Sequence, residues 1–157
     1  MGRLAHIGLF SNYSSKDKQI ALNAIEKVGI SHLKDNIYSQ ISGGERQLAF
    51  IARALTQESK IIFMDEPVTG LDYGNQLKLL KFLKELCTEG YTFVKTTHYP
   101  DHALYASNKV MMLKNGEILD VGQIDEKLTS QNIKSLYDVD VEIISRENGY
   151  KFCIPSI

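Results

Sequence analysis

The sequence predicts an α/β fold in which a parallel sheet is flanked by helices. Two short apolar runs, at 60–64 and 91–96, are rich in Ile, Val and Phe and have the length of strands. Between them, residues 74–87 carry leucines at helical spacing. The order strand, helix, strand favours two parallel strands joined by a right-handed crossover. Parallel strands are normally covered on both faces, so both apolar runs are expected to be buried.

Two further helices are expected before the first strand. Apolar residues at three-and-four spacing predict a helix from Ser15 to Val28, which Gly29 ends. Ser42 and Glu45 form a Ser-x-x-Glu capping box, so a second helix begins there. Its inward face would carry Leu48, Ile51, Ala52 and Leu55. Residues 1–14 show no regular pattern and are expected to be irregular.

The second half of the chain is expected to contain short elements separated by turn signals. Asn-Gly pairs mark hairpin turns, and a proline suits the first turn of a helix. The predicted elements are, in order, a short helix after Pro100, strands at 110–113 and 117–121 around Asn115-Gly116, two short helices within 123–138, and strands at 139–145 and 150–154 that pair across Asn148-Gly149.

Composition excludes several classes of protein. A net charge of −1 gives no bulk attraction to nucleic acid or to anionic lipid. The hydrophobic fraction of 43% and the charged fraction of 24% are ordinary for a globular domain, and no apolar run is long enough for a transmembrane helix. Two cysteines far apart in the sequence, Cys87 and Cys153, indicate reduced thiols rather than a disulfide or a metal site.

The turn Ser42-Gly43-Gly44-Glu45 is a candidate anion site. Glycines let backbone amides approach a phosphate closely, the start of a helix carries partial positive charge, and the serine hydroxyl adds a donor. A plain capped helix explains these four residues equally well. The residues that follow, Arg46-Gln47 and then Ile51-Ala52-Arg53-Ala54-Leu55, strongly favour the anion site.

Asp65 and Glu66 follow the first strand, at the sheet edge where ligands bind in folds of this kind. Asp65 can hold Mg²⁺, and Glu66 can act as a general base toward water. His98 follows the second strand, where a histidine can orient water or a phosphate. Asp72 can cap the next helix. Taken singly, each of these residues could also be a solvated side chain or a simple cap.

Together, these motifs resemble those of ATP-binding-cassette (ABC) ATPases. Ser42-Gly43-Gly44-Glu45-Arg46-Gln47 resembles the signature motif, Lys60–Pro67 the Walker B strand, Gly70-Leu71-Asp72 the D-loop, and Thr96-Thr97-His98 the switch-histidine segment. With Met1-Gly2-Arg3, Phe10-Ser11 and Val28-Gly29-Ile30, the likeness covers about residues 1–122. Within the family, the sequence is similar to the ATPases of importers for iron–siderophore, haem, cobalamin or molybdate.

The resemblance implies a truncated P-loop NTPase-like parallel sheet, flanked by helices, with part of the helical signature subdomain and a small C-terminal hairpin and helix region. The expected division of this single partial domain, 1–157, is a helical signature region (1–57), a Walker B, D-loop and switch-histidine core (58–122) and a C-terminal extension (123–157). The implied cofactors are ATP and Mg²⁺. Asp65 would hold the metal, Glu66 and His98 would be catalytic, and Ser42, Gly43, Gly44, Glu45 and Asp72 would contact the nucleotide.

One motif of the family is absent from the sequence: nowhere does it read Gly-x-x-x-x-Gly-Lys-Ser/Thr, the loop that cradles phosphates. The chain is therefore expected to be a fragment of a longer gene product or a degenerate paralogue, to expose apolar sheet edges, and by itself to bind ATP weakly or not at all.

The resemblance implies the ATP-binding subunit of a metal-chelate importer, at the cytoplasmic face of the cell membrane. Its partners would be a second ABC ATPase subunit and membrane-spanning permease subunits, with no nucleic acid. The alternative is a non-catalytic cassette fragment that binds a full-length ABC ATPase. A cassette of DNA repair or translation is disfavoured, because the sequence has neither a long coiled-coil insertion nor a second cassette.

Overall fold

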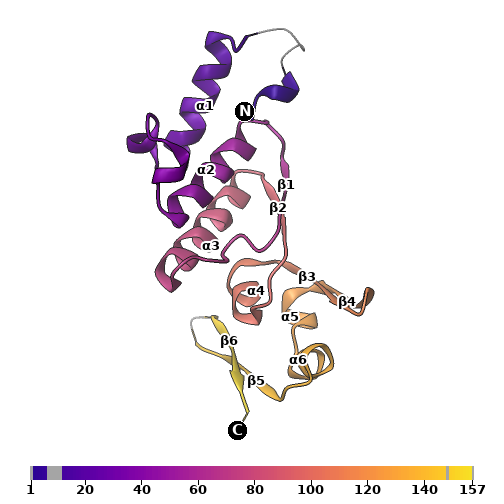
Figure 1. Ribbon diagram of the computed structural model, residues 1–157. Helices are drawn as coiled ribbons and strands as arrows, with labels where there is room; N and C mark the ends of the chain where they lie inside the picture. Colours follow the sequence, from indigo (N-terminus) through magenta and orange to yellow (C-terminus); the bar gives the residue numbers. More distant parts are fainter. Residues whose placement is uncertain (1, 7–11, 148, 157) are drawn as a thin grey trace. The chain divides into compact units, whose positions relative to one another are not determined.

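The computed structural model describes residues 2–6, 12–147 and 149–156 (Figure 1). The chain divides into two compact units, which are described separately. Unit 1 comprises Met1–Leu79 and Leu86–Lys95, and unit 2 comprises Leu80–Glu85 and Thr96–Ile157.

Two helices that lie side by side dominate the first part of unit 1 (Figure 1). Helix α1 (Ser15–Lys27) begins at a capping box between Ser14 and Asp17, and helix α2 (Gly43–Leu55) begins at the predicted box between Ser42 and Glu45. Single 3₁₀ turns occupy Ser31–Leu33 and Tyr38–Gln40 between them. Both predicted helices are therefore confirmed. Of the four residues expected to face inward from α2, Ile51, Ala52 and Leu55 are buried and Leu48 is half-buried.

The sheet of unit 1 contains the two predicted parallel strands. Strand β1 (Ile61–Met64) pairs with β2 (Thr92–Lys95), with Ile61 opposite Thr92 and Phe63 opposite Val94. Helix α3 (Tyr73–Thr88) connects them, and Asp72 caps it. The order strand, helix, strand thus produces the expected parallel pairing.

The expectation that both strands are buried is wrong for one face of this sheet. Ile61, Phe63 and Val94 share that face by register, and they are 56%, 77% and 46% exposed, whereas Ile62 on the other face is 7% exposed. Among the described residues the sheet has only two strands, and no element covers the outer face. Apolar side chains therefore stand in solvent on a face of the sheet, whereas the sequence predicted exposure at its edges.

Unit 2 is built from short elements around a small apolar core. They are α4 (Pro100–Ala106), β3 (Lys109–Lys114), β4 (Glu117–Gln123), α5 (Ile124–Lys127), α6 (Ser130–Tyr137), β5 (Val141–Ser145) and β6 (Lys151–Pro155). Strands β3–β4 and β5–β6 form two antiparallel hairpins. The core contains Ala103, Met112, Ile124, Leu128 and Ile133. Every predicted element is present, although Asn148 of the second turn lies outside the described residues.

The N-terminal segment is more ordered than its sequence indicates. Leu4–His6 forms a 3₁₀ turn, and the Arg3 side chain is buried. Arg3 pairs with Asp17 at 2.9 Å and with Glu58, and it donates a hydrogen bond to the Thr56 carbonyl at 3.1 Å. The expectation of an irregular start is therefore wrong for residues 3–6, while Phe10 and Ser11 lie outside the described residues.

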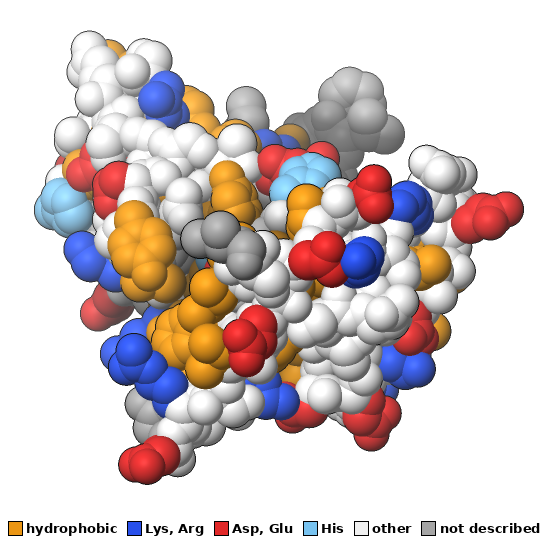
Figure 2. Space-filling model, turned by 90° about the horizontal axis from the view of Figure 1, so that it is seen from below, with side chains coloured by type: hydrophobic (Ala, Val, Ile, Leu, Met, Phe, Trp, Pro, Cys, Tyr) orange, Lys and Arg blue, Asp and Glu red, His pale blue; other side chains and the backbone are white. Residues whose placement is uncertain are grey.

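The surface carries both signs of charge. On the face drawn in Figure 2, basic and acidic side chains are interspersed, and apolar side chains reach the surface between them. This pattern agrees with the near-zero net charge of the whole sequence. No helix among the described residues has the length and apolar character needed to cross a membrane.

Candidate nucleotide site

The signature-like turn opens α2 and is held by reciprocal hydrogen bonds. The Glu45 amide donates to Ser42 Oγ at 3.3 Å, and the Ser42 amide donates to Glu45 Oε2 at 2.7 Å. Hydrogen bonds from the Ser42 side chain and backbone hold the pKa of Glu45 below its ordinary value. His32 Nε2 lies 3.9 Å from Glu45 Oε1, a contact that the sequence does not indicate. The capping interpretation of these residues is therefore correct, whatever else they do.

The two glycines of this turn are not explained by packing within the chain. Neither has a positive φ. A Cβ atom at Gly43 would lie 3.8 Å from its nearest neighbour, and one at Gly44 would lie 3.6 Å away, which are ordinary contact distances. Glycine in a helix costs about 0.5–1 kcal/mol relative to alanine. Among the described residues, nothing requires that cost, so these positions suit a group that approaches from outside.

Asp72 caps α3 beside the same turn. Its Oδ1 accepts a hydrogen bond from the Asn75 amide at 3.0 Å, and this bond is the main reason that the pKa of Asp72 lies below its ordinary value. A Cβ atom at Gly44 would lie nearest to the side chains of Asn75 and Leu71. A Cβ atom at Gly43 would lie nearest to the carbonyl oxygen of Gly70. The structure therefore brings the D-loop-like segment against the start of α2.

The two adjacent carboxylates follow β1 directly. Asp65 is exposed and Glu66 is half-buried. The backbone of Glu66 has a φ of 40°, in the left-handed region that residues other than glycine rarely adopt. Such a conformation costs on the order of 1–3 kcal/mol and is concentrated at functional sites. Thr69 Oγ1 donates a hydrogen bond to Glu66 Oε2 at 2.8 Å.

The described residues contain no group of three or more His, Cys, Asp or Glu side chains that could hold a metal. Mg²⁺ does not need such a group when phosphates and water complete its shell, because it is commonly bound through one or two carboxylates. Asp65, an exposed carboxylate at a strand end, fits that requirement only in the presence of a phosphate ligand.

His98 belongs to unit 2, whereas the other candidate site residues belong to unit 1. It is exposed and lies in the segment that joins β2 to α4. The geometry of unit 1 thus brings together the start of α2 and the Asp72 segment, and the role of His98 stays a prediction.

Sequence reasoning missed two residues of this region. Thr69 contacts the predicted base, and the only sequence signal is a hydroxyl residue three positions after Glu66. Lys95 ends β2 opposite Met64, and burial lowers the pKa of its amine. In the sequence, a lysine at the end of an apolar run gives no sign that its amine is buried.

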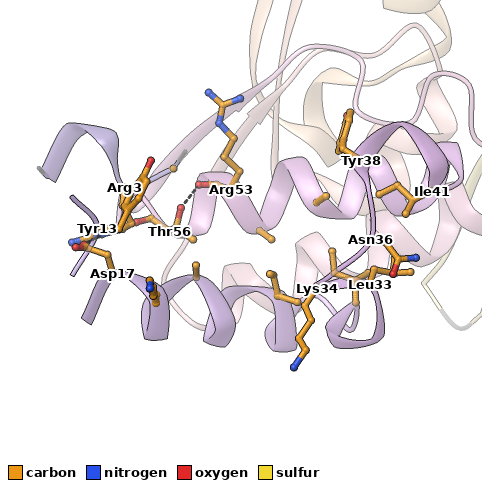
Figure 3. Close-up of a pocket in the computed structure, with 17 residues that line it drawn as sticks. Arg3, Tyr13, Asp17, Leu33, Lys34, Asn36, Tyr38, Ile41, Arg53 and Thr56 are labelled. Atoms are coloured by element: carbon orange, nitrogen blue, oxygen red, sulfur yellow. Dashed lines mark hydrogen bonds and ion pairs between the residues drawn. The ribbon is translucent and has the colours of Figure 1, made fainter. Parts of the chain in front are cut away.

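A separate cavity of about 410 Å³ lies between α1 and α2 (Figure 3). Arg3, Tyr13, Asp17 and Thr56 line one end, and Leu33 and Asn36 lie toward the other, while the side chains of Lys34 and Arg53 extend away from the space between the helices. None of the predicted site residues lines this cavity. It is therefore not the candidate nucleotide site.

Two parallel strands joined by a helix, with two carboxylates directly after the first strand and a capped glycine turn at the start of α2, fit an α/β protein of the ATP-binding-cassette type. The ABC transporter family profile matches residues 4–69. The chain is 38% identical to the molybdate import ATP-binding protein MolC of Haemophilus influenzae, over 87% of this chain and 54% of MolC. It is 36% identical to the ferric enterobactin transport ATP-binding protein FepC of Escherichia coli, over 91% of this chain and 53% of FepC.

A solved structure shares the fold over the whole chain. It is described as a metal-chelate type ABC transporter in an inward-facing conformation, and it matches with a TM-score of 0.93 and 32% identity, covering 100% of this chain and 64% of the other. The chain belongs to the ABC transporter ATP-binding family. It spans about half the length of the curated relatives that it matches.

Proposed function

We propose that this chain supplies the signature turn and the Walker B carboxylates of an ATP-hydrolysing site. The observation that carries the proposal is the pair of glycines at the start of α2, which internal packing does not require. Backbone amides at a helix start, with partial positive charge and no side chains of their own, suit a phosphate group. The strained Glu66 beside Asp65 supports a catalytic role at the neighbouring strand end.

The proposed roles follow from chemistry. Asp65 holds Mg²⁺, which neutralises charge on the phosphates when it is bound. Glu66 accepts a proton from the attacking water, and His98 orients the γ-phosphate. Ser42 to Glu45, with Asp72 nearby, face a nucleotide held by the phosphate loop of a second ABC ATPase subunit.

We further propose that the complete protein drives the import of a metal chelate. Two names support this class of cargo: FepC is a ferric enterobactin transport protein, and the solved structure is described as a metal-chelate type transporter. MolC is a molybdate import protein, so its cargo is a metal oxyanion. The partners would be membrane-spanning permease subunits, which would place the chain at the cytoplasmic face of the membrane.

The test uses a fusion of this chain to the phosphate-loop portion of a related subunit. Glu66→Gln removes the base but keeps the ligands, so turnover should fall by roughly 10²-fold or more while ATP binding is retained. Glu126→Gln, at an exposed position in the first turn of α5, is the matched control and should hydrolyse ATP at the parental rate. Parental turnover in Glu66→Gln would exclude Glu66 as the base.

A second candidate function is a non-catalytic module that binds a full-length ABC ATPase. The exposed apolar face of Ile61, Phe63 and Val94 favours it, because such a face suits a protein partner. On this view, the isolated chain does not hydrolyse ATP but raises or blocks the ATPase activity of the full-length protein. No change in that activity at saturating concentrations of the chain would exclude this candidate.

A further inference from the structure

We propose that Thr69 positions the carboxylate of Glu66, an inference that rests on the role of Glu66 as the general base proposed above. Thr69 lies in the loop between β1 and α3, three residues after Glu66. None of the motifs described for the sequence assigns it a role. Two hydrogen bonds connect it to Glu66, one to the side chain and one to the backbone.

The first bond fixes the carboxylate itself. Thr69 Oγ1 donates to Glu66 Oε2 at 2.8 Å, within the ordinary range for an O–H···O hydrogen bond. Because it holds one carboxylate oxygen, this bond restricts rotation of the whole Glu66 side chain, which has several rotatable bonds.

The second bond joins the backbones of the same two residues. The Thr69 amide donates to the Glu66 carbonyl at 3.0 Å, closing a turn that begins at Glu66 and encloses Pro67 and Val68. This turn brings the Thr69 side chain back toward Glu66, so that its hydroxyl can reach the carboxylate.

The loop that carries Thr69 is itself anchored. Pro67 and Val68 are buried, and the Leu71 amide donates to the Val68 carbonyl at 3.2 Å. Gly70 has a φ of 78°, a backbone conformation that would be strained in a residue with a side chain. Its carbonyl oxygen is the nearest atom to a Cβ built at Gly43. Thr69 thus links the candidate base to the segment that packs against the glycine turn of α2.

The test measures the Glu66 side-chain conformation directly, in the ¹³C,¹⁵N-labelled full chain. Three-bond couplings from Glu66 Cγ to its backbone nitrogen and carbonyl carbon report the χ1 rotamer. Thr69→Val removes the hydroxyl at nearly constant volume, and Thr69→Ser keeps it. Ser59→Ala is the control, because it removes a hydroxyl bonded to the Ile61 carbonyl at 2.8 Å, in the same unit.

We expect one dominant rotamer in the parent, in Thr69→Ser and in Ser59→Ala, and averaged couplings in Thr69→Val. Rotamer averaging in the parent, unchanged couplings in Thr69→Val or averaged couplings in Thr69→Ser would overturn the proposal. These outcomes do not depend on ATP hydrolysis, so they stand apart from the test of Glu66 as the base. In the fusion that hydrolyses ATP, Thr69→Val should lower kcat roughly 2- to 10-fold at constant KM, the effect of one net hydrogen bond.

Discussion

The two ends of α2 are held in different ways. Near its C-terminal end, Ile51 is 1% exposed and Leu55 is buried, and Arg3 donates to the carbonyl of the buried Thr56. At its N-terminal end, Ser42 and Gly43 are exposed, and the capping box supplies the hydrogen bonds. One end is built into the core of unit 1, while the other presents its backbone to solvent.

This difference separates residues that stabilise the fold from residues available for binding. Substitutions near the C-terminal end should act on the free energy of unfolding, because they remove buried contacts. Substitutions at the N-terminal end should change stability little, because few contacts are lost there. Their main effect should instead fall on nucleotide-dependent behaviour, because the proposed phosphate contact lies at this end.

The largest effect on stability is expected at Ile51. Truncation of a fully buried isoleucine leaves a cavity, so Ile51→Ala should lower the free energy of unfolding by about 2–5 kcal/mol. Phe50→Ala, at a half-exposed neighbour whose ring contacts Tyr38, should cost about 1 kcal/mol or less. Urea titration measures both. Equal losses in the two variants would contradict the contrast between the exposed and buried faces of α2.

A smaller loss is expected at the N-terminal end. Ser42→Ala removes the side-chain acceptor of the capping box and should cost about 1 kcal/mol. Ser42→Gly should cost only a few tenths of a kcal/mol, because glycine is itself tolerated at this position. Thermal unfolding of both variants checks the prediction, and a loss in Ser42→Ala as large as that in Ile51→Ala would refute it.

Gly43→Ala should sharpen the contrast between the two ends of α2, because this substitution is expected to raise the free energy of unfolding, whereas the substitutions above lower it. The nearest atom to the added Cβ would lie at 3.8 Å, so the methyl group fits, and alanine should stabilise α2 by about 0.5 kcal/mol. In the fusion the same methyl group would stand between the backbone and a phosphate, so ATP turnover should fall. A destabilised protein, or a stabilised one with parental turnover, would argue against a phosphate at this turn.

The anchor of the C-terminal end should also depend on pH. Hydrogen bonds from Ser14, followed by the one from Arg3, hold the pKa of Asp17 at about 2, against 3.8 for a free aspartate. A carboxyl group with a lowered pKa contributes stability above its unfolded pKa and loses it as the pH falls through the folded value. The free energy of unfolding should therefore decline between about pH 4 and pH 2. In Asp17→Asn that part of the decline should disappear, which urea titrations across the range would detect.

Local signals predicted much of the fold. The capping box located the start of α2 because its hydrogen bonds form between residues three apart, and the Asn115-Gly116 pair located the β3–β4 hairpin for the same kind of reason. The parallel pairing of β1 and β2 followed from the order of the elements. The first two signals depend on neighbours in the sequence, and the third depends only on the order of the elements.

The missed features depend on partners far along the chain or on backbone geometry. Arg3 is buried because Asp17 and Glu58 reach it from 14 and 55 residues away. The exposure of Phe63 follows from which elements cover the sheet, and its own residue type indicates burial. The left-handed backbone of Glu66 has no signature in its residue type. At the candidate site, residue types could therefore suggest the carboxylates, but not Thr69, which holds one of them.

The most direct test of the proposed site compares ATP-dependent dimerisation of the fusion in two variants, measured by light scattering. Glu66→Gln leaves the phosphate contacts in place and should form a dimer when ATP is added. Ser42→Ala, folded and only about 1 kcal/mol less stable, should remain monomeric because it lacks the donor to a phosphate across the dimer. Dimerisation of Ser42→Ala at the parental ATP concentration would leave Ser42 as a helix cap and contradict a contact between its hydroxyl and a phosphate across the dimer.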